Sequence, residues 1–197
     1  MHNFWDQRYS IEAYAYGEEP NKFITEEMAK LNPGRILFPA EGEGRNAVYA
    51  ATQGWQVSAF DPSTEGRKKA LQLAGKHNVE IDYRIASYDD INYLDDYFDC
   101  IVLVFAHMPA NKRTAYHQKL AGFLKPGGSL ILEGFSKEQL NYSSGGPQNL
   151  EMLFSEAEIQ NDFSGFSSLV VKKTKILLDE GLYHKGPASV IRAVGIK

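Results

Sequence analysis

A glycine-rich segment with two carboxylates is the part of this sequence with the clearest chemical meaning. Residues 39–47 read Pro-Ala-Glu-Gly-Glu-Gly-Arg-Asn-Ala and follow a short apolar run. Glycines at a turn from a strand into a helix let a ligand approach the backbone closely. The spacing of Gly42, Gly44 and Ala47 also satisfies the fingerprint of a dinucleotide-binding turn, although that pattern alone is weakly specific.

The charges in this segment favour a cationic ligand over a dinucleotide. Glu41 and Glu43 lie inside the turn, and each would repel a nearby phosphate by about 1 kcal/mol or more. S-adenosylmethionine has no phosphate and carries a sulfonium and an ammonium, so the two carboxylates suit it. Asp61 ends the next apolar run, 17 residues after Gly44, and is predicted to accept hydrogen bonds from ribose hydroxyls.

Alternating apolar runs and helical patterns predict the elements that position these residues. Strands are expected over residues 35–39, 55–60, 80–85, 98–105 and 129–133, and helices over 46–53, 64–77 and 111–123. Ser63 is expected to cap the second of these helices, and Gly54 to end the first. Two extended segments, 169–178 and 188–196, follow with no helix between them and should pair antiparallel. The predicted fold is therefore α/β, a doubly wound, mostly parallel seven-stranded sheet (Rossmann-like) that ends in an antiparallel hairpin.

Composition narrows the class of protein and of partner. The 197 residues are 43% hydrophobic and 23% charged, with a net charge of −4 and no long basic stripe, so no nucleic-acid partner is expected. No stretch approaches the length of a membrane span, and the N-terminus lacks the pattern of a secretion signal. Cys100 is the only cysteine and is expected to be buried and structural. These features favour a cytoplasmic location and a small-molecule substrate, with the oligomeric state left open.

Ligands of an open parallel sheet bind beyond the carboxyl ends of its strands, which directs attention to three basic side chains. His107 follows the fourth predicted strand and is a candidate general base or anion-orienting group, with a structural role as the alternative. His184 and Lys185 lie in the loop of the terminal hairpin. Their adjacent donors make them candidates for holding an oxyanion.

Aromatic residues are frequent at the N-terminus. Trp5, Tyr9, Tyr14 and Tyr16 occur within the first 16 residues. They could form a lid that keeps water from the site, or they could seal the edge of the core.

Several short motifs, in this order and spacing, resemble class I S-adenosylmethionine-dependent methyltransferases and, among them, the tellurite-resistance methyltransferase group. The motifs lie at residues 5–9, 16–17, 40–46, 105–109, 124–128, 133–135 and 145–147. The resemblance covers nearly the whole chain. It implies a single domain over residues 1–197, with an N-terminal lid and helix over 1–32 and a sheet core over 33–197.

The resemblance also implies S-adenosylmethionine as cofactor and a set of residues that would bind it. These are Tyr16, Ala40, Glu41, Gly42, Gly44, Arg45, Asn46, Asp61, Ser87, Tyr88 and Phe105. Three positions depart from the family pattern. Phe38 replaces the usual acidic residue before the turn, Ala40 replaces the first glycine, and Ser87 replaces an acidic residue that meets adenine.

Together these observations predict S-adenosylmethionine-dependent methyl transfer to a small acceptor. A soft nucleophile or an oxyanion is expected, such as tellurite, selenite or a thiol, and no metal site is predicted. One alternative is a nicotinamide-dependent oxidoreductase, which the acidic turn and the terminal hairpin disfavour. The other alternative is a module that binds S-adenosylmethionine without catalysis. The sequence leaves the acceptor and the existence of a general base open.

Overall fold

The computed structural model describes residues 2–197, so Met1, the first residue of the predicted lid, lies outside the described part. In chain order the elements are α1 (His2–Tyr9), α2 (Lys22–Met28), β1 (Arg35–Pro39), α3 (Arg45–Thr52), β2 (Gln56–Asp61), α4 (Thr64–Lys76), β3 (Asp82–Ile85), β4 (Phe98–Val104), α5 (Ala110–Phe123), β5 (Leu124–Phe135), the 3-10 helices η1 (Lys137–Asn141) and η2 (Leu150–Met152), α6 (Glu156–Asp162), β6 (Ser168–Glu180) and β7 (His184–Ile196).

The seven strands form one mixed sheet in the order β3-β2-β1-β4-β5-β7-β6. β2 pairs in parallel with β1 and β3, and β4 pairs in parallel with β5. β7 pairs antiparallel with β5, from Ser129 opposite Ile196 to Phe135 opposite Val190. The predicted fold class, a mostly parallel Rossmann-like sheet with antiparallel C-terminal strands, is confirmed.

Contacts divide the chain into two compact units. Unit 1 contains the residues up to Asn92 together with Glu180–Tyr183, and unit 2 contains Tyr93–Asp179 and His184–Lys197. The division falls after residue 92, within the predicted sheet core over 33–197. The assignment of the whole chain to a single domain stays a prediction.

Unit 1 contains β1 to β3 and the helices that follow them. The side chains of Ile36, Leu37 and Phe38 in β1 are fully buried, as expected for a parallel strand that is covered on both faces. The start of α4 is confirmed, because the Ser63 hydroxyl accepts a hydrogen bond from the N–H of Gly66 at 3.0 Å. The end of α3 is also near its predicted place, and Gly54 follows it with a φ of 87°.

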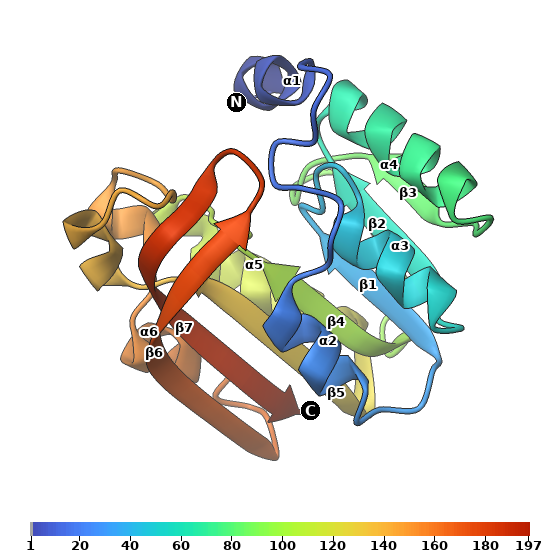
Figure 1. The fold of residues 1–197 in the computed structure, drawn as a ribbon. Helices are drawn as coiled ribbons and strands as arrows, with labels where there is room; N and C mark the ends of the chain where they lie inside the picture. Colours follow the sequence, from blue (N-terminus) through green and yellow to red (C-terminus); the bar gives the residue numbers. More distant parts are fainter. Residues whose placement is uncertain (1) are drawn as a thin grey trace. The chain divides into compact units, whose positions relative to one another are not determined.

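Helix α1 lies against α4 within unit 1 (Figure 1). A carboxylate oxygen of Asp6 accepts hydrogen bonds from the Ser63 hydroxyl at 2.6 Å and from the N–H of Glu65 at 3.2 Å. The N-terminal helix is therefore attached to the first turn of α4 by polar contacts.

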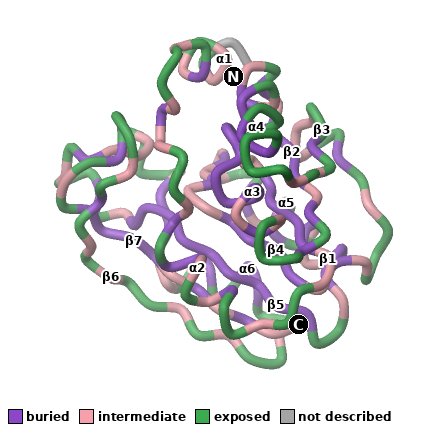
Figure 2. Tube along the Cα trace, turned by 45° about the vertical axis from the view of Figure 1, so that its right-hand side comes forward, coloured by how far each residue is buried: buried purple, intermediate pink, exposed green. Residues whose placement is uncertain are grey.

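Unit 2 contains β4 to β7 with α5 and α6. The apolar run in β4 is buried as predicted, and Cys100 within it is fully buried. The side chains of Ser155 and Glu158 form a capping box at the start of α6, a helix that the sequence patterns did not indicate. β6 and β7 are 13 residues each, longer than predicted. Buried residues are frequent in β7, whereas β6 is mostly exposed or half-exposed (Figure 2).

The close packing of α4 on the glycine-rich turn leads to a prediction with an internal control. Gly44 has a φ of 88°, and a Cβ atom there would lie 2.5 Å from the Cβ of Ala70. Gly54 has almost the same φ, 87°, but a Cβ there would meet nothing within 4 Å. We expect Gly44→Ala to lower the free energy of unfolding by about 1–3 kcal/mol more than Gly54→Ala in urea titrations, because only the first overpacks the core. Equal losses in both variants would contradict the packing role of Gly44.

Candidate active site

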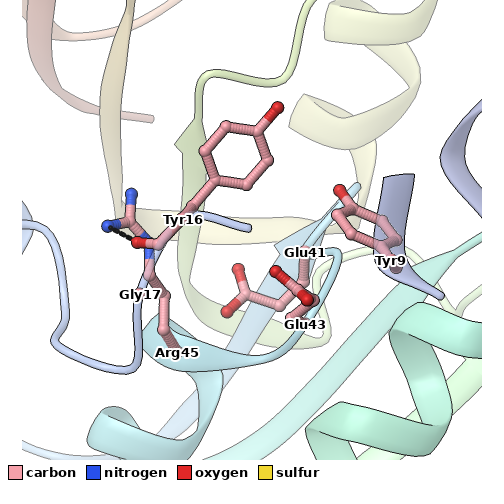
Figure 3. Close-up of a pocket in the computed structure, with 6 residues that line it drawn as sticks. All are labelled: Tyr9, Tyr16, Gly17, Glu41, Glu43 and Arg45. Carbon is pink, nitrogen blue, oxygen red and sulfur yellow. Dashed lines mark hydrogen bonds between the residues drawn. The ribbon is translucent and has the colours of Figure 1, made fainter. Parts of the chain in front are cut away.

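Unit 1 contains a small pocket of about 30 Å³ beside the glycine-rich turn (Figure 3). Its walls come from the end of α1, the segment after α1, the β1–α3 turn and the start of α3. The lining residues are Tyr9, Tyr16, Gly17, Glu41, Glu43 and Arg45. Carboxylates, a guanidinium and two phenol rings therefore meet at one place.

The turn between β1 and α3 adopts left-handed backbone conformations at three positions. The φ angles are 51° at Ala40, 61° at Gly42 and 88° at Gly44. The N–H of Glu41 donates to the carbonyl of Phe60 at 3.2 Å, which fixes the turn to the end of β2. Ala40 thus takes a conformation that suits glycine, the residue that the family pattern has at this place.

The two glycines of the turn permit close packing within the protein. A Cβ atom on Gly42 would lie 2.6 Å from the Tyr9 hydroxyl oxygen, and the Gly42 carbonyl accepts a hydrogen bond from Tyr83 at 2.6 Å. The glycines predict that a ligand approaches the backbone here. In the structure, Tyr9 occupies the space that a side chain on Gly42 would fill.

Glu41 caps the helix that follows the turn. Its Oε1 atom accepts hydrogen bonds from the N–H groups of Asn46 at 2.9 Å and Ala47 at 2.8 Å. Burial raises the pKa of Glu41 to about 7, against the opposing effect of these N–H groups and of Arg45. The pocket therefore contains a carboxyl group that titrates near neutral pH.

Glu43 is already paired inside the protein. Its Oε1 atom lies 2.8 Å from the ammonium of Lys69, and its Oε2 atom accepts a hydrogen bond from the N–H of Ala15 at 2.8 Å. The sequence predicts that Glu41 and Glu43 are both counter-charges for a cationic ligand. In the structure Lys69 compensates Glu43, whereas Glu41 is bonded to the N–H groups of Asn46 and Ala47 and is influenced by the side chain of Asn46 and the charge of Arg45.

Asp61 stabilises the turn by hydrogen bonds to the backbone. Its Oδ2 atom accepts a hydrogen bond from the N–H of Gly42 at 3.1 Å, and its Oδ1 atom accepts one from the N–H of Ser63 at 2.8 Å. The side chain is almost completely buried. A carboxylate has about four acceptor positions, so the predicted bonds to ribose hydroxyls are compatible with these contacts, and the role stays a prediction.

Four further predicted cofactor residues lie in unit 1, two at the start of α3 and two after β3. Arg45 lines the pocket and pairs with Glu180 at 2.8 Å, and the adjacent Asn46 accepts a hydrogen bond from the N–H of Asn21 at 2.9 Å. Ser87 donates to a carboxylate oxygen of Asp90 at 2.5 Å, and the ring of Tyr88 packs edge-on against Phe60. None of these contacts tests the predicted adenine site.

Phe105 and the three predicted catalytic residues belong to unit 2. Phe105 directly follows β4 with a φ of 49°, and its ring packs on Phe135 and His184 at centroid distances of 4.6 and 4.5 Å. His184 is buried in this aromatic cluster, whereas Lys185 is exposed. Neighbouring residues of a strand point to opposite faces, so the structure does not support a single oxyanion site built from His184 and Lys185.

His107 is a structural histidine in this conformation. Its Nδ1 atom lies 2.8 Å from the carbonyl oxygen of Met152, and its Nε2 atom accepts a hydrogen bond from the N–H of Phe135 at 3.0 Å. Nδ1 must therefore carry the proton, and both ring nitrogens are occupied. Burial lowers the pKa of His107 to about 4. In this conformation both ring nitrogens contact backbone groups, and a role of His107 as general base or anion-orienting group stays a prediction.

A second buried polar cluster connects α5 with α6 in unit 2. Asp162 accepts hydrogen bonds from Arg113 at 2.7 Å and from Thr114 at 2.7 Å, and it lies 2.9 Å from Nδ1 of His117. Burial lowers the pKa of His117. This cluster stabilises the packing of the two helices. Within residues 2–197, no group of three or more potential ligand side chains is placed to hold a metal ion.

Sequence reasoning found part of the pocket and missed part of it. Tyr16, Glu41 and Arg45, which were predicted to bind the cofactor, line it, whereas Gly42 and Asp61 are hydrogen-bonded to each other and are not among its lining residues. Glu43 was predicted as a counter-charge to the cofactor, whereas Tyr9 and Gly17 were not among the predicted binding residues. The Tyr16-Gly17 pair and the early tyrosines were the available signals, because both lie in motifs that the resemblance identified.

The state of His107 predicts how stability depends on pH. Its pKa is about 4 in the folded protein and 6.5 in an ordinary setting, so the unfolded chain binds the extra proton between these values. Stability from His107 is present above pH 6.5 and is lost as the pH falls to 4, by up to about 3 kcal/mol. We expect urea titrations from pH 7 to 4.5 to show a shallower pH dependence in His107→Gln than in the unmodified protein. The exposed His77→Gln variant is the control and should keep the original slope, and an unchanged slope in His107→Gln would exclude this role.

Comparisons with known proteins assign the central segment to a domain type. Residues 36–128 match the family model described as "Methyltransferase domain". A ubiquinone/menaquinone biosynthesis C-methyltransferase of Geotalea daltonii is 29% identical over 124 residues, which cover 58% of this chain and 51% of that protein. The chain spans about half the length, or less, of the curated relatives it matches.

Solved structures agree on the fold. A structure described as "Conversion of a Disulfide Bond into a Thioacetal Group during Echinomycin Biosynthesis" has a TM-score of 0.79 and 16% identity, and covers 100% of this chain and 91% of that one. TehB from Haemophilus influenzae has a TM-score of 0.70 and 14% identity, and covers 100% of this chain and 66% of that one. No helix within residues 2–197 has the length and apolar character needed to cross a membrane. Residues 36–128 therefore resemble a methyltransferase domain, and the chain shares the Rossmann-like fold of solved S-adenosylmethionine-dependent methyltransferases.

Proposed function

We propose that this chain transfers the methyl group of S-adenosylmethionine to a small acceptor. The observation that carries the proposal is the carboxyl group of Glu41 in the pocket wall, within the segment that matches the methyltransferase domain. Its oxygen contacts are the N–H groups of Asn46 and Ala47. Arg45 already acts to lower the pKa of Glu41, yet burial keeps it at about 7, so a cationic ligand in the pocket would add opposite charge that favours the ionised form.

The chemistry of the pocket suits this cofactor. Glu41 is placed to hold the α-ammonium, and the rings of Tyr9 and Tyr16 offer faces that attract a cation such as the sulfonium. Asp61 is the candidate for the ribose hydroxyls. When bound, S-adenosylmethionine supplies an electrophilic methyl group, and the protein residues bind it and exclude water. The present pocket of about 30 Å³ is far smaller than the roughly 300–1,000 Å³ of ligand pockets, so part of its lining moves when the cofactor enters.

The acceptor that this site favours is one that needs no general base. The ring nitrogens of His107 both contact backbone groups, and Lys185 lies on the opposite face of β7 from His184. An oxyanion or a soft nucleophile that is already ionised, such as tellurite, selenite or a thiolate, meets this requirement. The likeness to TehB supports the fold only, so tellurite is one member of the proposed class. The cytoplasmic location inferred from the sequence belongs to the same proposal.

Ligand binding distinguishes the proposed function from its alternatives. We expect S-adenosylmethionine and S-adenosylhomocysteine to bind in calorimetry and NAD not to bind, because Glu41 would repel its diphosphate. Transfer of labelled methyl to a panel of oxyanions and thiols should then identify the acceptor. Binding of NAD without S-adenosylhomocysteine would favour an oxidoreductase, and binding without turnover on any acceptor would favour a non-catalytic module.

The pKa of Glu41 predicts proton release when the cofactor binds. A cation in contact with Glu41 favours its ionised form, so binding lowers a pKa that is about 7 in the free protein. We expect the affinity for S-adenosylmethionine to rise with pH up to about 7 and then level off, by at most about tenfold per pH unit. Calorimetry in buffers of different ionisation enthalpy measures the released proton. Glu41→Gln should abolish the release and the exposed Glu151→Gln should keep it; release that persists in Glu41→Gln would assign the titration to another group.

A further inference from the structure

The tip of the β6–β7 hairpin, Glu180–Tyr183, belongs to the same compact unit as the pocket. It lies against residues 13–17, which we call the strap because they run from α1 toward α2 without regular structure. Two of the pocket-lining residues, Tyr16 and Gly17, are in the strap. The contacts between tip and strap therefore bear directly on the pocket.

Two glycines bring the backbones of tip and strap together. Gly181 and Gly17 have φ angles of 65° and 75°. A Cβ atom on Gly181 would lie 2.4 Å from the backbone nitrogen of Gly17 and 2.7 Å from the carbonyl oxygen of Ala15. These are contacts with backbone atoms that no side-chain rotation can relieve, so only glycine allows this approach.

Hydrogen bonds connect this approach to the turn that forms the pocket. The N–H of Leu182 donates to the carbonyl of Ala15 at 3.0 Å. The N–H of the same Ala15 donates to Oε2 of Glu43 in the pocket wall at 2.8 Å. One fully buried strap residue thus bonds to the tip on one side and to the glycine-rich turn on the other.

Side chains add a second layer of contacts around the strap. Glu180 accepts hydrogen bonds from Arg45 at 2.8 Å and from Asn21 at 3.1 Å. Arg45 also donates to the carbonyl of Tyr16 at 3.1 Å. The guanidinium of Arg8 lies 3.8 Å from the ring centroid of Tyr183 and donates to the Tyr16 hydroxyl at 3.2 Å. Tyr16 is therefore hydrogen-bonded at its backbone carbonyl by Arg45 and at its side-chain hydroxyl by Arg8.

We propose that the tip is a latch for the strap, and that Gly181 and Glu180 are positioning residues that set the rate of cofactor exchange. This inference rests on the proposed function. The pocket must enlarge about tenfold to hold the cofactor, and the strap is the part of its lining that lies outside helices, strands and the packed glycine turn. Release of the tip frees Tyr16 and Gly17, and its return closes them over the ligand.

Gly181→Ala is the variant that tests the latch, and Gly127→Ala is its matched control. Gly127 has a φ of 77°, but a Cβ atom there would meet nothing within 4 Å. Both variants therefore carry similar backbone strain, while only Gly181→Ala separates tip from strap. We expect the dissociation rate of S-adenosylhomocysteine, measured by stopped flow, to rise by about tenfold in Gly181→Ala, equivalent to one lost hydrogen bond. The control should keep the original rate.

Hydrogen exchange tests the same proposal without ligand. The amides of Ala15 and Leu182 should exchange faster in Gly181→Ala than in Gly127→Ala. Faster exchange with an unchanged dissociation rate would overturn the latch, as would unchanged exchange. If the unmodified protein binds no S-adenosylhomocysteine, the proposed function fails, and exchange alone decides whether the tip holds the strap.

A second variant covers the case in which Gly181→Ala does not fold. Glu180→Gln removes the charge that pairs with Arg45 but keeps a polar group of the same size. Its control is Glu138→Gln, which removes an exposed ion pair with Lys173. We expect faster dissociation of S-adenosylhomocysteine in Glu180→Gln only, with the KM for the cofactor raised more than kcat is changed. Equal rates in both variants would show that the ion pair has no part in exchange.

Discussion

The carboxylate of Asp61 accepts hydrogen bonds from the N–H groups of Gly42 and Ser63. The architecture of unit 1 around the pocket depends on these two bonds. A buried carboxylate is unfavourable unless its oxygens are hydrogen-bonded, so the turn and the start of α4 must both meet it. Ser63 then caps α4 and donates to Asp6 of α1. Ser63 thus connects Asp61 at the end of β2 with the N-terminal helix.

The pocket wall and the core of unit 1 are built from the same contacts. Tyr9 closes over Gly42, Ala70 packs on Gly44, and Lys69 of α4 neutralises Glu43. A ligand that enters must therefore compete with the packing of the protein. Of the two carboxylates in the turn, Glu43 is bonded to Lys69 and Ala15 within the protein. Glu41 is the one whose charge has no such lysine partner among these contacts, and it lines the pocket.

Features that depend on local sequence could be predicted, and features that depend on distant contacts could not. Ser63 as a cap and the buried run of β4 follow from patterns within a few residues. The roles of Glu43 and His107 depend on Lys69 and on the carbonyl of Met152, which are 26 and 45 residues away. The periodic pattern of apolar residues in a sequence does not reveal which distant residues will be in contact. The separation of His184 from Lys185 was missed because both were predicted in the hairpin loop, whereas β7 already begins at His184 and alternates its side chains between faces.

The exposed strand β6 forms one edge of the sheet, and its composition affects how copies of the chain behave toward one another. Val170 and Leu177 are 70% and 77% exposed on this strand, a pattern that would invite strand addition from a second molecule. Lys172, Lys173 and Lys175 lie between them, and the N–H of Lys173 is already bonded to Glu156. Lys173 is paired with Glu138, so Lys172 and Lys175 supply the positive charge that makes two such edges repel each other, and resistance to aggregation at this edge depends on ionic strength. Chemical neutralisation of these lysines would remove that protection.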